Sequence, residues 1–196
     1  MDCMGLGDRI LVYGVTGAGK SSLAARVSAI TGIPWHSVDD LTFKPGNWES
    51  TPVEEQRAVF GRVCEGDRWI LDSAYGTWLD IPLARVETVL GLDYPRQVSL
   101  LRLMRRTVLR SIRGDMVCNG NRETLRGAVS RQSIIAWHFK SFDRKRARIR
   151  KWSSEPQDFD TIRFRSPRET DQWVAELAQS WTERRRSADV SGVMSR

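Results

Sequence analysis

Five short apolar runs recur along the chain, with helical patterns in the intervals between them. The runs cover residues 9–15, 33–39, 68–73, 88–93 and 160–166. Strands that alternate with helices indicate a parallel sheet that carries helices on both of its faces. We therefore predict an α/β fold whose five strands form one parallel sheet.

Two sequence signals mark the starts of helices. The sequences TPVE at 51–54 and SPRE at 166–169 each combine a capping hydroxyl, a proline at the first helical position and an early glutamate. We expect a helix to begin at each of them.

The segment after the fourth run has the pattern of an amphipathic helix with a basic face. One helical stripe carries Leu101, Met104, Val108 and Ile112, and another carries Arg102, Arg106, Arg110 and Arg113. We expect the apolar stripe to face inward and the arginines to face outward. A turn-rich segment at 114–127 and a second long helix over about 128–152 follow, which predicts a hairpin-like insertion.

Positive charge is concentrated in this insertion. Residues 96–151 hold 16 Lys and Arg residues against three acidic residues, a local charge of +13 in a chain whose net charge is +7. Such a segment favours a polyanionic partner.

Length and composition indicate a single domain. The chain has 196 residues and 40% hydrophobic content, and we place this domain at 1–181, with a lid insertion at about 96–151 and a disordered tail at 182–196.

The sequence has neither an apolar stretch long enough to cross a bilayer nor a signal-peptide pattern, so we expect a cytoplasmic protein. The cysteines lack zinc-site spacing, and we expect them to be buried or free thiols.

The sequence GVTGAGKS at 14–21 lies between the first apolar run and a helical segment. In that context its glycines let backbone N–H groups turn toward a phosphate, and the start of the helix adds a positive dipole. Lys20 would reach the β and γ phosphates, and Ser21 would ligate Mg²⁺. The alternative is a glycine-rich turn with an exposed lysine. The predicted nucleotide contacts are Gly14, Thr16, Gly17, Ala18, Gly19, Lys20, Ser21 and Ser22.

Acidic residues follow two of the predicted strands at the same edge of the sheet. Asp72 ends the third run and either completes the Mg²⁺ site or caps the next turn. Asp39 ends the second run and either orients or deprotonates an acceptor hydroxyl, or forms a turn. Asp40 competes with it for that role. We expect Asp93 to fix a turn or to anchor an arginine.

Two arginines are candidate catalytic cations, together with Lys20. Phosphoryl transfer spreads negative charge over the moving group, and cations that close over the group stabilise that charge. Arg102 and Arg106 lie one helical turn apart and fit this role. The alternative is that they belong to a solvated face.

With these features the chain resembles the adenylate-kinase-like P-loop kinases, and within them the subgroup labelled DNA topology modulation proteins. The likeness runs from about residue 10 to residue 173 and includes DDLTFKPGNWESTPVEE, DRWILDSAYGTWLDIPLAR and LDYPRQVSLLRLMRR. The resemblance implies a P-loop NTPase fold with strand order 2-3-1-4-5. It also implies phosphate and metal contacts for Lys20 and Ser21, acceptor and metal contacts for Asp39 and Asp72, and lid cations at Arg102 and Arg106.

The acceptor is the least defined part of this reading. Asp72 is followed by SAYG and not by the GFPR of AMP-binding enzymes, which argues against AMP. Trp48, Tyr75 and Trp78 either stack on an acceptor base or belong to the core.

We therefore expect a phosphotransferase of the nucleotide-kinase-like class that uses ATP and Mg²⁺ and an unidentified small acceptor. Two alternatives stay open. One is a nucleic-acid-binding regulator switched by a nucleotide, and the other is an NTP hydrolase without a small acceptor. We expect no membrane partner.

Overall fold

The computed structural model describes residues 6–44, 49–113, 116–117, 121–122 and 128–193. Its main sheet has five strands, all parallel, in the order β2-β3-β1-β4-β7. Counted within that sheet the order is 2-3-1-4-5, so the predicted fold class and strand order are confirmed. The strands are β1 (Arg9–Gly14), β2 (Trp35–His36), β3 (Trp69–Leu71), β4 (Thr88–Leu92) and β7 (Asp160–Phe164).

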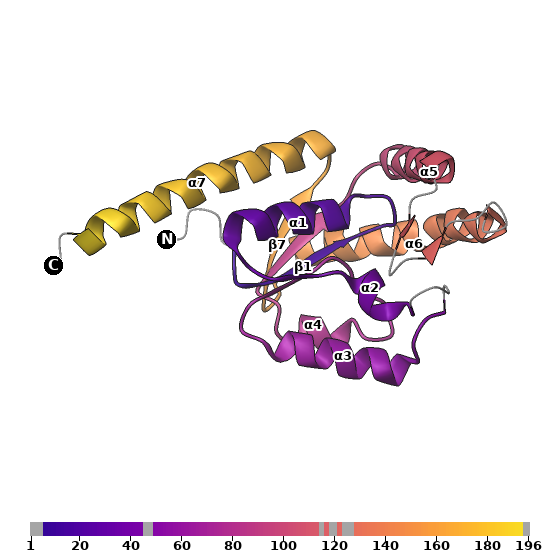
Figure 1. The fold of residues 1–196 in the computed structure, drawn as a ribbon, viewed down its shortest axis with the longest axis horizontal. Coiled ribbons are helices and arrows are strands. Elements are labelled where there is room, and N and C mark those ends of the chain that lie inside the picture. Colours follow the sequence, from indigo (N-terminus) through magenta and orange to yellow (C-terminus); the bar gives the residue numbers. More distant parts are fainter. Residues whose placement is uncertain (1–5, 45–48, 114–115, 118–120, 123–127, 194–196) are drawn as a thin grey trace.

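Helices cover both faces of this sheet. They are α1 (Lys20–Thr31), α2 (Val38–Thr42), α3 (Val53–Glu65), α4 (Asp80–Leu83), α5 (Arg96–Arg113), α6 (Ala128–Ser154) and α7 (Pro167–Val193), and β5 (Met116–Val117) pairs with β6 (Asn121–Arg122) between α5 and α6. Figure 1 shows α1 and α7 on one side of the sheet and α3 and α4 on the other. Helices α3 and α7 begin within the two predicted start sequences. Within the described residues, no helix has both the length and the apolar character needed to span a membrane.

Side chains of β1 alternate between two halves of the core. Ile10 and Val12 belong to the apolar cluster shared with α1 and α7, and Leu11 and Tyr13 belong to the cluster shared with α3 and α4. Successive residues of a strand point to opposite faces, so a strand that is covered on both faces needs an unbroken apolar run. The first apolar run of the sequence is such a run.

The second half of α6 belongs to the body of the domain. Ile149 and Trp152 lie in the core cluster on the α3 side of the sheet. A Cβ added to Gly91 in β4 would lie 2.6 Å from Cγ2 of Ile149, so the glycine permits this close approach. The structure thus differs from a lid that extends over 96–151, because apolar residues fasten the end of α6 to the sheet.

Of the orientation predicted for α5, the exposure of Arg102 and Arg106 is confirmed, but the burial of Leu101 and Met104 is wrong. Leu101 is 66% exposed and Met104 is 49% exposed, whereas Leu103 is 2% exposed. The helix packs against the glycine-rich loop through Leu103. A Cβ added to Gly17 would lie 3.0 Å from the Cβ of Leu103. Periodicity shows that a helix has two faces, but it does not show which neighbour each face meets. The side chains of Val108, Arg110, Ile112 and Arg113 lie outside the described part of the structure.

Helix α7 continues through Val193, where the sequence predicts a disordered tail from residue 182. Residues 182–186 are all exposed, and Figure 1 shows this end of α7 extending beyond the sheet. Glutamate and arginine favour helix without any apolar partner. The apolar pattern therefore ends before the helix does.

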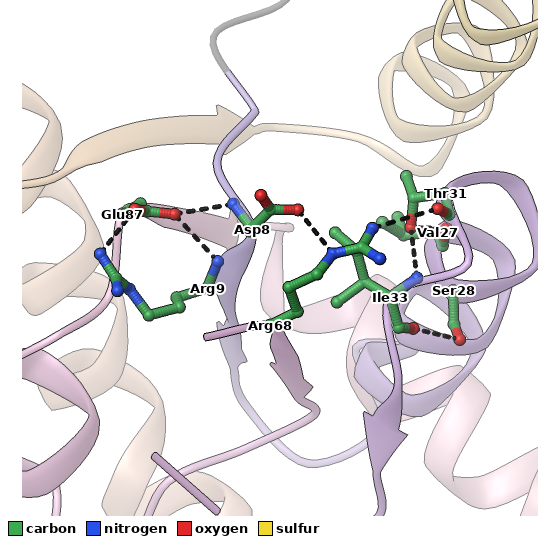
Figure 2. A network of polar contacts seen from close by, with 8 residues as sticks. All are labelled: Asp8, Arg9, Val27, Ser28, Thr31, Ile33, Arg68 and Glu87. Atoms are coloured by element: carbon green, nitrogen blue, oxygen red, sulfur yellow. Dashed lines mark hydrogen bonds and ion pairs between the residues drawn. The ribbon is translucent and has the colours of Figure 1, made fainter. Parts of the chain in front are cut away.

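Polar contacts join the strand starts at the edge of the sheet opposite the glycine-rich loop, as Figure 2 shows. Glu87, before β4, accepts the backbone N–H groups of Asp8 and Arg9 and pairs with the Arg9 guanidinium at 2.6 Å. Arg68, before β3, donates to the Asp8 carboxylate at 3.0 Å and to the Thr31 carbonyl at the end of α1. These contacts fix β1, β3 and β4 relative to one another.

One carboxylate joins α6 to the sheet. The Asp93 side chain, directly after β4, is fully buried and accepts hydrogen bonds from Arg146 and Arg150 of α6 and from Arg163 of β7. Burial raises the pKa of Asp93, but the three hydrogen bonds outweigh burial and hold this pKa below its usual value. The expectation that Asp93 anchors an arginine is confirmed.

We expect Asp93→Ala to lower the free energy of unfolding by about 3 kcal/mol, because three partly buried guanidinium groups lose their shared partner. The folded-state pKa of Asp93 lies below the unfolded value, so its stabilisation is present above about pH 4 and is lost as the pH falls through the folded-state pKa. Urea unfolding at pH 7 and pH 3 measures both effects. The exposed Asp143 pairs with Arg96, and Asp143→Ala is a matched control that should cost under about 1 kcal/mol. Equal losses in the two variants would contradict this role for Asp93.

Candidate phosphate-binding site

The glycine-rich loop lies at the carboxyl end of β1, at the centre of the sheet. Strand β1 pairs with β3 on one side and with β4 on the other. In open parallel sheets, ligands bind in the crevice that such a position creates. Gly14 ends β1, Thr16 and Ala18 lie within the loop, and Lys20 is the first residue of α1. The predicted order of strand, loop and helix is therefore present.

Backbone geometry makes the loop compact. Gly17 has φ +81°, and a Cβ at this residue would lie 2.4 Å from the Ser99 carbonyl oxygen of α5, so no other residue fits there. In the described part of the chain no side chain caps the start of α1, which leaves its first N–H groups to an anion. The Lys20 ammonium folds back and donates to the Val15 carbonyl at 3.1 Å. The geometry of the loop, the helix start and the lysine is thus suited to a phosphate group.

Ser21 and Asp72 are in contact at the start of α1. The Ser21 hydroxyl lies close enough to the Asp72 carboxylate to lower its pKa, and Oδ1 of Asp72 accepts the Val38 N–H at 2.9 Å. Burial raises the pKa of Asp72, against the opposing effects of Ser21 and of the Val38 N–H. Mg²⁺ prefers oxygen ligands and binds through one or two protein groups plus substrate phosphates. A hydroxyl and a carboxylate in contact fit that ion, and the structure brings the two predicted metal ligands together.

Lys20 lies among charges of both signs. Burial lowers the pKa of Lys20, Asp39 and Asp72 raise it, and Arg106 lowers it further. The net direction is downward, so the surrounding carboxylates do not fully compensate the charge of this lysine. A polyanion at the loop would supply the missing stabilisation.

Asp39 lies on α2 and not at the end of a strand. The predicted run at 33–39 overestimates β2, because the side chain of Ser37 accepts the Asp40 N–H at 3.4 Å and starts a helix. A capping serine thus ends the strand within the predicted run. Asp39 nevertheless stays at the carboxyl edge of the sheet, within electrostatic reach of Lys20.

The Asp39 carboxylate is exposed and hydrogen-bonded to an aromatic hydroxyl. Tyr75 donates to its Oδ1 at 2.8 Å. Trp78 is fully buried and stacks on Phe60 with 3.9 Å between the ring centres, so this tryptophan belongs to the core. Trp48 lies outside the described residues. Of the two aromatic candidates that the structure describes, Tyr75 is the one that hydrogen-bonds a predicted site residue.

Arg102 and Arg106 border a cavity beside the loop. Arg102 donates to the Ala18 carbonyl at 3.2 Å, and its guanidinium carbon lies 5.6 Å from the centre of the Tyr94 ring. The cavity has a volume of about 310 Å³, and its lining includes Gly19, Ser22, Tyr94, Arg102, Arg106 and Thr170. Its cationic and polar lining, with the loop as one wall, suits the phosphates and sugar of a nucleotide.

Lys145 is a residue of this site that the sequence reading missed. It lies on α6, is 8% exposed, and its Nζ donates to the Gly14 carbonyl at 3.2 Å. Together with the buried Phe142, Ile149 and Trp152 of the same helix, Lys145 forms a stripe with spacings of three and four residues. That stripe is the one signal that could have placed this lysine inward within a basic run.

Comparisons with known proteins define the fold. No protein-family model matches the chain, and no curated protein sequence matches it. A sugar kinase from Janibacter sp. HTCC2649 is similar in structure, with 17% identity, a TM-score of 0.51 and coverage of 91% of this chain and 95% of that one. The shikimate kinase of Acinetobacter baumannii, solved with shikimate, has 14% identity, a TM-score of 0.53 and coverage of 90% and 93%. At these identities the likeness establishes the fold alone, which is the P-loop NTPase fold that these structures share.

Proposed function

We propose that this protein is a phosphotransferase that uses ATP and Mg²⁺ and phosphorylates a small acceptor. The observation that carries the proposal is the convergence of three groups at one sheet edge. They are the loop with Lys20, the Ser21–Asp72 contact and the exposed carboxylate of Asp39. The solved structures with this fold that support the proposal are named as sugar and shikimate kinases.

Each group has a role in the proposed reaction. The loop N–H groups and Lys20 bind the triphosphate, and Asp39 accepts the proton of the attacking acceptor hydroxyl. Tyr75 donates to Asp39 and thereby holds that carboxylate in one orientation. Ser21 and Asp72 would hold Mg²⁺, which supplies neutralisation of the charge on the phosphates. Arg102 and Arg106 stabilise the charge on the moving phosphoryl group.

The acceptor side distinguishes this proposal from an NTP hydrolase. An exposed carboxylate that is fixed by a tyrosine hydroxyl beside the phosphate loop is suited to a hydroxyl group of a second substrate. A nucleotide-switched regulator of nucleic acid has less support, because much of the basic segment is engaged within the protein. Arg146 and Arg150 bind Asp93, and Lys145 and Arg102 bind carbonyls of the loop region. The resemblance to DNA topology modulation proteins stays a prediction.

A panel of acceptors tests the proposal. The protein is incubated with Mg-ATP and separate nucleosides, nucleotides, sugars and hydroxy acids, and ADP and phosphorylated products are measured. We expect ADP and one new phosphorylated compound in equal amounts. ADP with inorganic phosphate, and no phosphorylated acceptor in any reaction, would support the hydrolase.

We expect Arg106→Ala to lower kcat by about 10- to 100-fold while changing nucleotide affinity less than about threefold, because the arginine acts on charge that develops during transfer. Arg105→Ala, on the exposed side of α5, is the matched control and should leave both values unchanged. Fluorescence anisotropy with duplex DNA tests the alternative of a nucleic-acid-binding regulator. It is measured at about 0.15 M ionic strength, because salt at that concentration screens weak electrostatic binding. Submicromolar DNA affinity, together with no effect of Arg106→Ala on turnover, would favour the regulator.

A further inference from the structure

Lys145 brings a second ammonium group to the phosphate loop from a distant part of the chain. Its Nζ donates to the Gly14 carbonyl at 3.2 Å and lies 5.4 Å from the centre of the Tyr13 ring. The side chain is almost completely buried, yet a carbonyl oxygen and an aromatic face neutralise no charge. In the described residues the ion pairs of α6 are formed by Asp143, Arg146, Arg150 and Lys151, and none involves Lys145.

The charged groups that face Lys145 come from several elements. Lys20 approaches from α1, Asp39 from α2, and Arg144 and Arg148 from α6 itself. Burial lowers the pKa of Lys145 to about 7, and Lys20 and the two arginines act in the same direction, while Asp39 opposes them. Near α6, Asp93 pairs with Arg163 and Arg96 pairs with Asp143.

This arrangement lacks a negative charge between two amines. Lys20 and Lys145 both donate to carbonyls of the same loop region, those of Val15 and Gly14. A buried ammonium needs a charged partner, and among the described residues Asp39 is the carboxylate that acts on both lysines. A polyanion at the loop would change the sign of the field at Lys145 from repulsive to attractive.

We propose that Lys145 is a second phosphate-binding cation of this site and that polyphosphate binding draws a proton onto its amine. The inference rests on the proposed function, which supplies the polyphosphate. The proton comes from the buffer and adds to the lone pair of Nζ, and the phosphate oxygens compensate the new charge. Above neutral pH the free protein lacks this proton, so affinity for polyphosphate falls as the pH rises.

Calorimetry of a non-hydrolysable ATP analogue with Mg²⁺ tests the proposal. Titrations at pH 8 in buffers of different ionisation enthalpy give the number of protons taken up on binding. At that pH we expect Lys145→Met to lose most of one proton of uptake relative to the wild type, because a group with a pKa of about 7 is about nine-tenths deprotonated there. Lys140→Met, on an exposed position of the same helix, should keep the wild-type uptake.

The pH dependence of affinity gives a second measurement. Between pH 7.5 and 9 the wild-type Kd for the analogue should rise by up to about tenfold per pH unit, and the rise should be smaller in Lys145→Met. Lys145→Arg keeps a charge at all these pH values and should bind without the extra proton uptake. If Lys145→Met fails to fold, Lys145→Arg still tests the inference. Equal proton uptake in wild type and in either Lys145 variant overturns the inference and leaves the proposed function standing. A wild type that binds no analogue overturns both.

Discussion

We expect the replacement of Lys20 with alanine to remove nearly all of the proposed phosphoryl transfer and to weaken the binding of Mg-ATP. Lys20 lies at the start of α1, where its ammonium already contacts the loop through the Val15 carbonyl at 3.1 Å. A bound triphosphate would interact both with that ammonium and with the positive end of the helix dipole. Loss of one donor aimed at developing charge costs about 100- to 1,000-fold in kcat, and we expect at least that loss here. Turnover and calorimetry on the same preparations measure the two effects.

The stability of this variant separates a catalytic role from a structural one. Burial lowers the pKa of Lys20, so its charge costs folding free energy, and the melting temperature of Lys20→Ala should be unchanged or higher. Lys151→Ala removes an exposed lysine that pairs with Glu155 and should change neither activity nor binding. A variant that melts earlier and keeps its turnover would instead make Lys20 a structural residue of the loop.

The sheet could be predicted from the sequence because strands buried on both faces leave unbroken apolar runs. Local signals at 51–54 and 166–169 marked helix starts for a similar reason, since capping chemistry is confined to a few neighbouring residues. The apolar pattern does not show whether residue 39 belongs to a strand or to a helix, because both structures are compatible with it. Ser37 caps a helix inside an apolar stretch, and the strand ends earlier than its hydrophobicity indicates.

Contacts between distant segments account for the other differences. Leu103, and not Leu101, meets the loop, because the path of α5 over Gly17 decides which stripe is covered. Lys145 joins the site because Ile149 fastens α6 to the sheet beside Gly91. By contrast, the phosphate loop with its lysine and serine is contiguous in sequence, and a contiguous motif carries its own geometry.

Replacing Asp72 with asparagine should leave the fold intact and lower kcat by about 100-fold, with a higher Mg²⁺ requirement for the remaining activity. An amide keeps the shape of the side chain and can still accept the Val38 N–H that Asp72 accepts at 2.9 Å. It loses the negative charge that makes the contact with Ser21 a site for a divalent cation. Activity measured over a full Mg²⁺ titration gives both parameters.

The matched control and the stability of the variant decide between a metal ligand and a turn-capping aspartate. Asp143→Asn removes an exposed carboxylate on α6 and should leave the Mg²⁺ titration unchanged. Burial raises the pKa of Asp72, so its ionised form is already disfavoured in the folded protein and the amide should not lower the melting temperature. A residue that only caps the turn after β3 would give the opposite result. Its replacement would reduce stability, and the Mg²⁺ concentration for half-maximal activity would stay at the wild-type value.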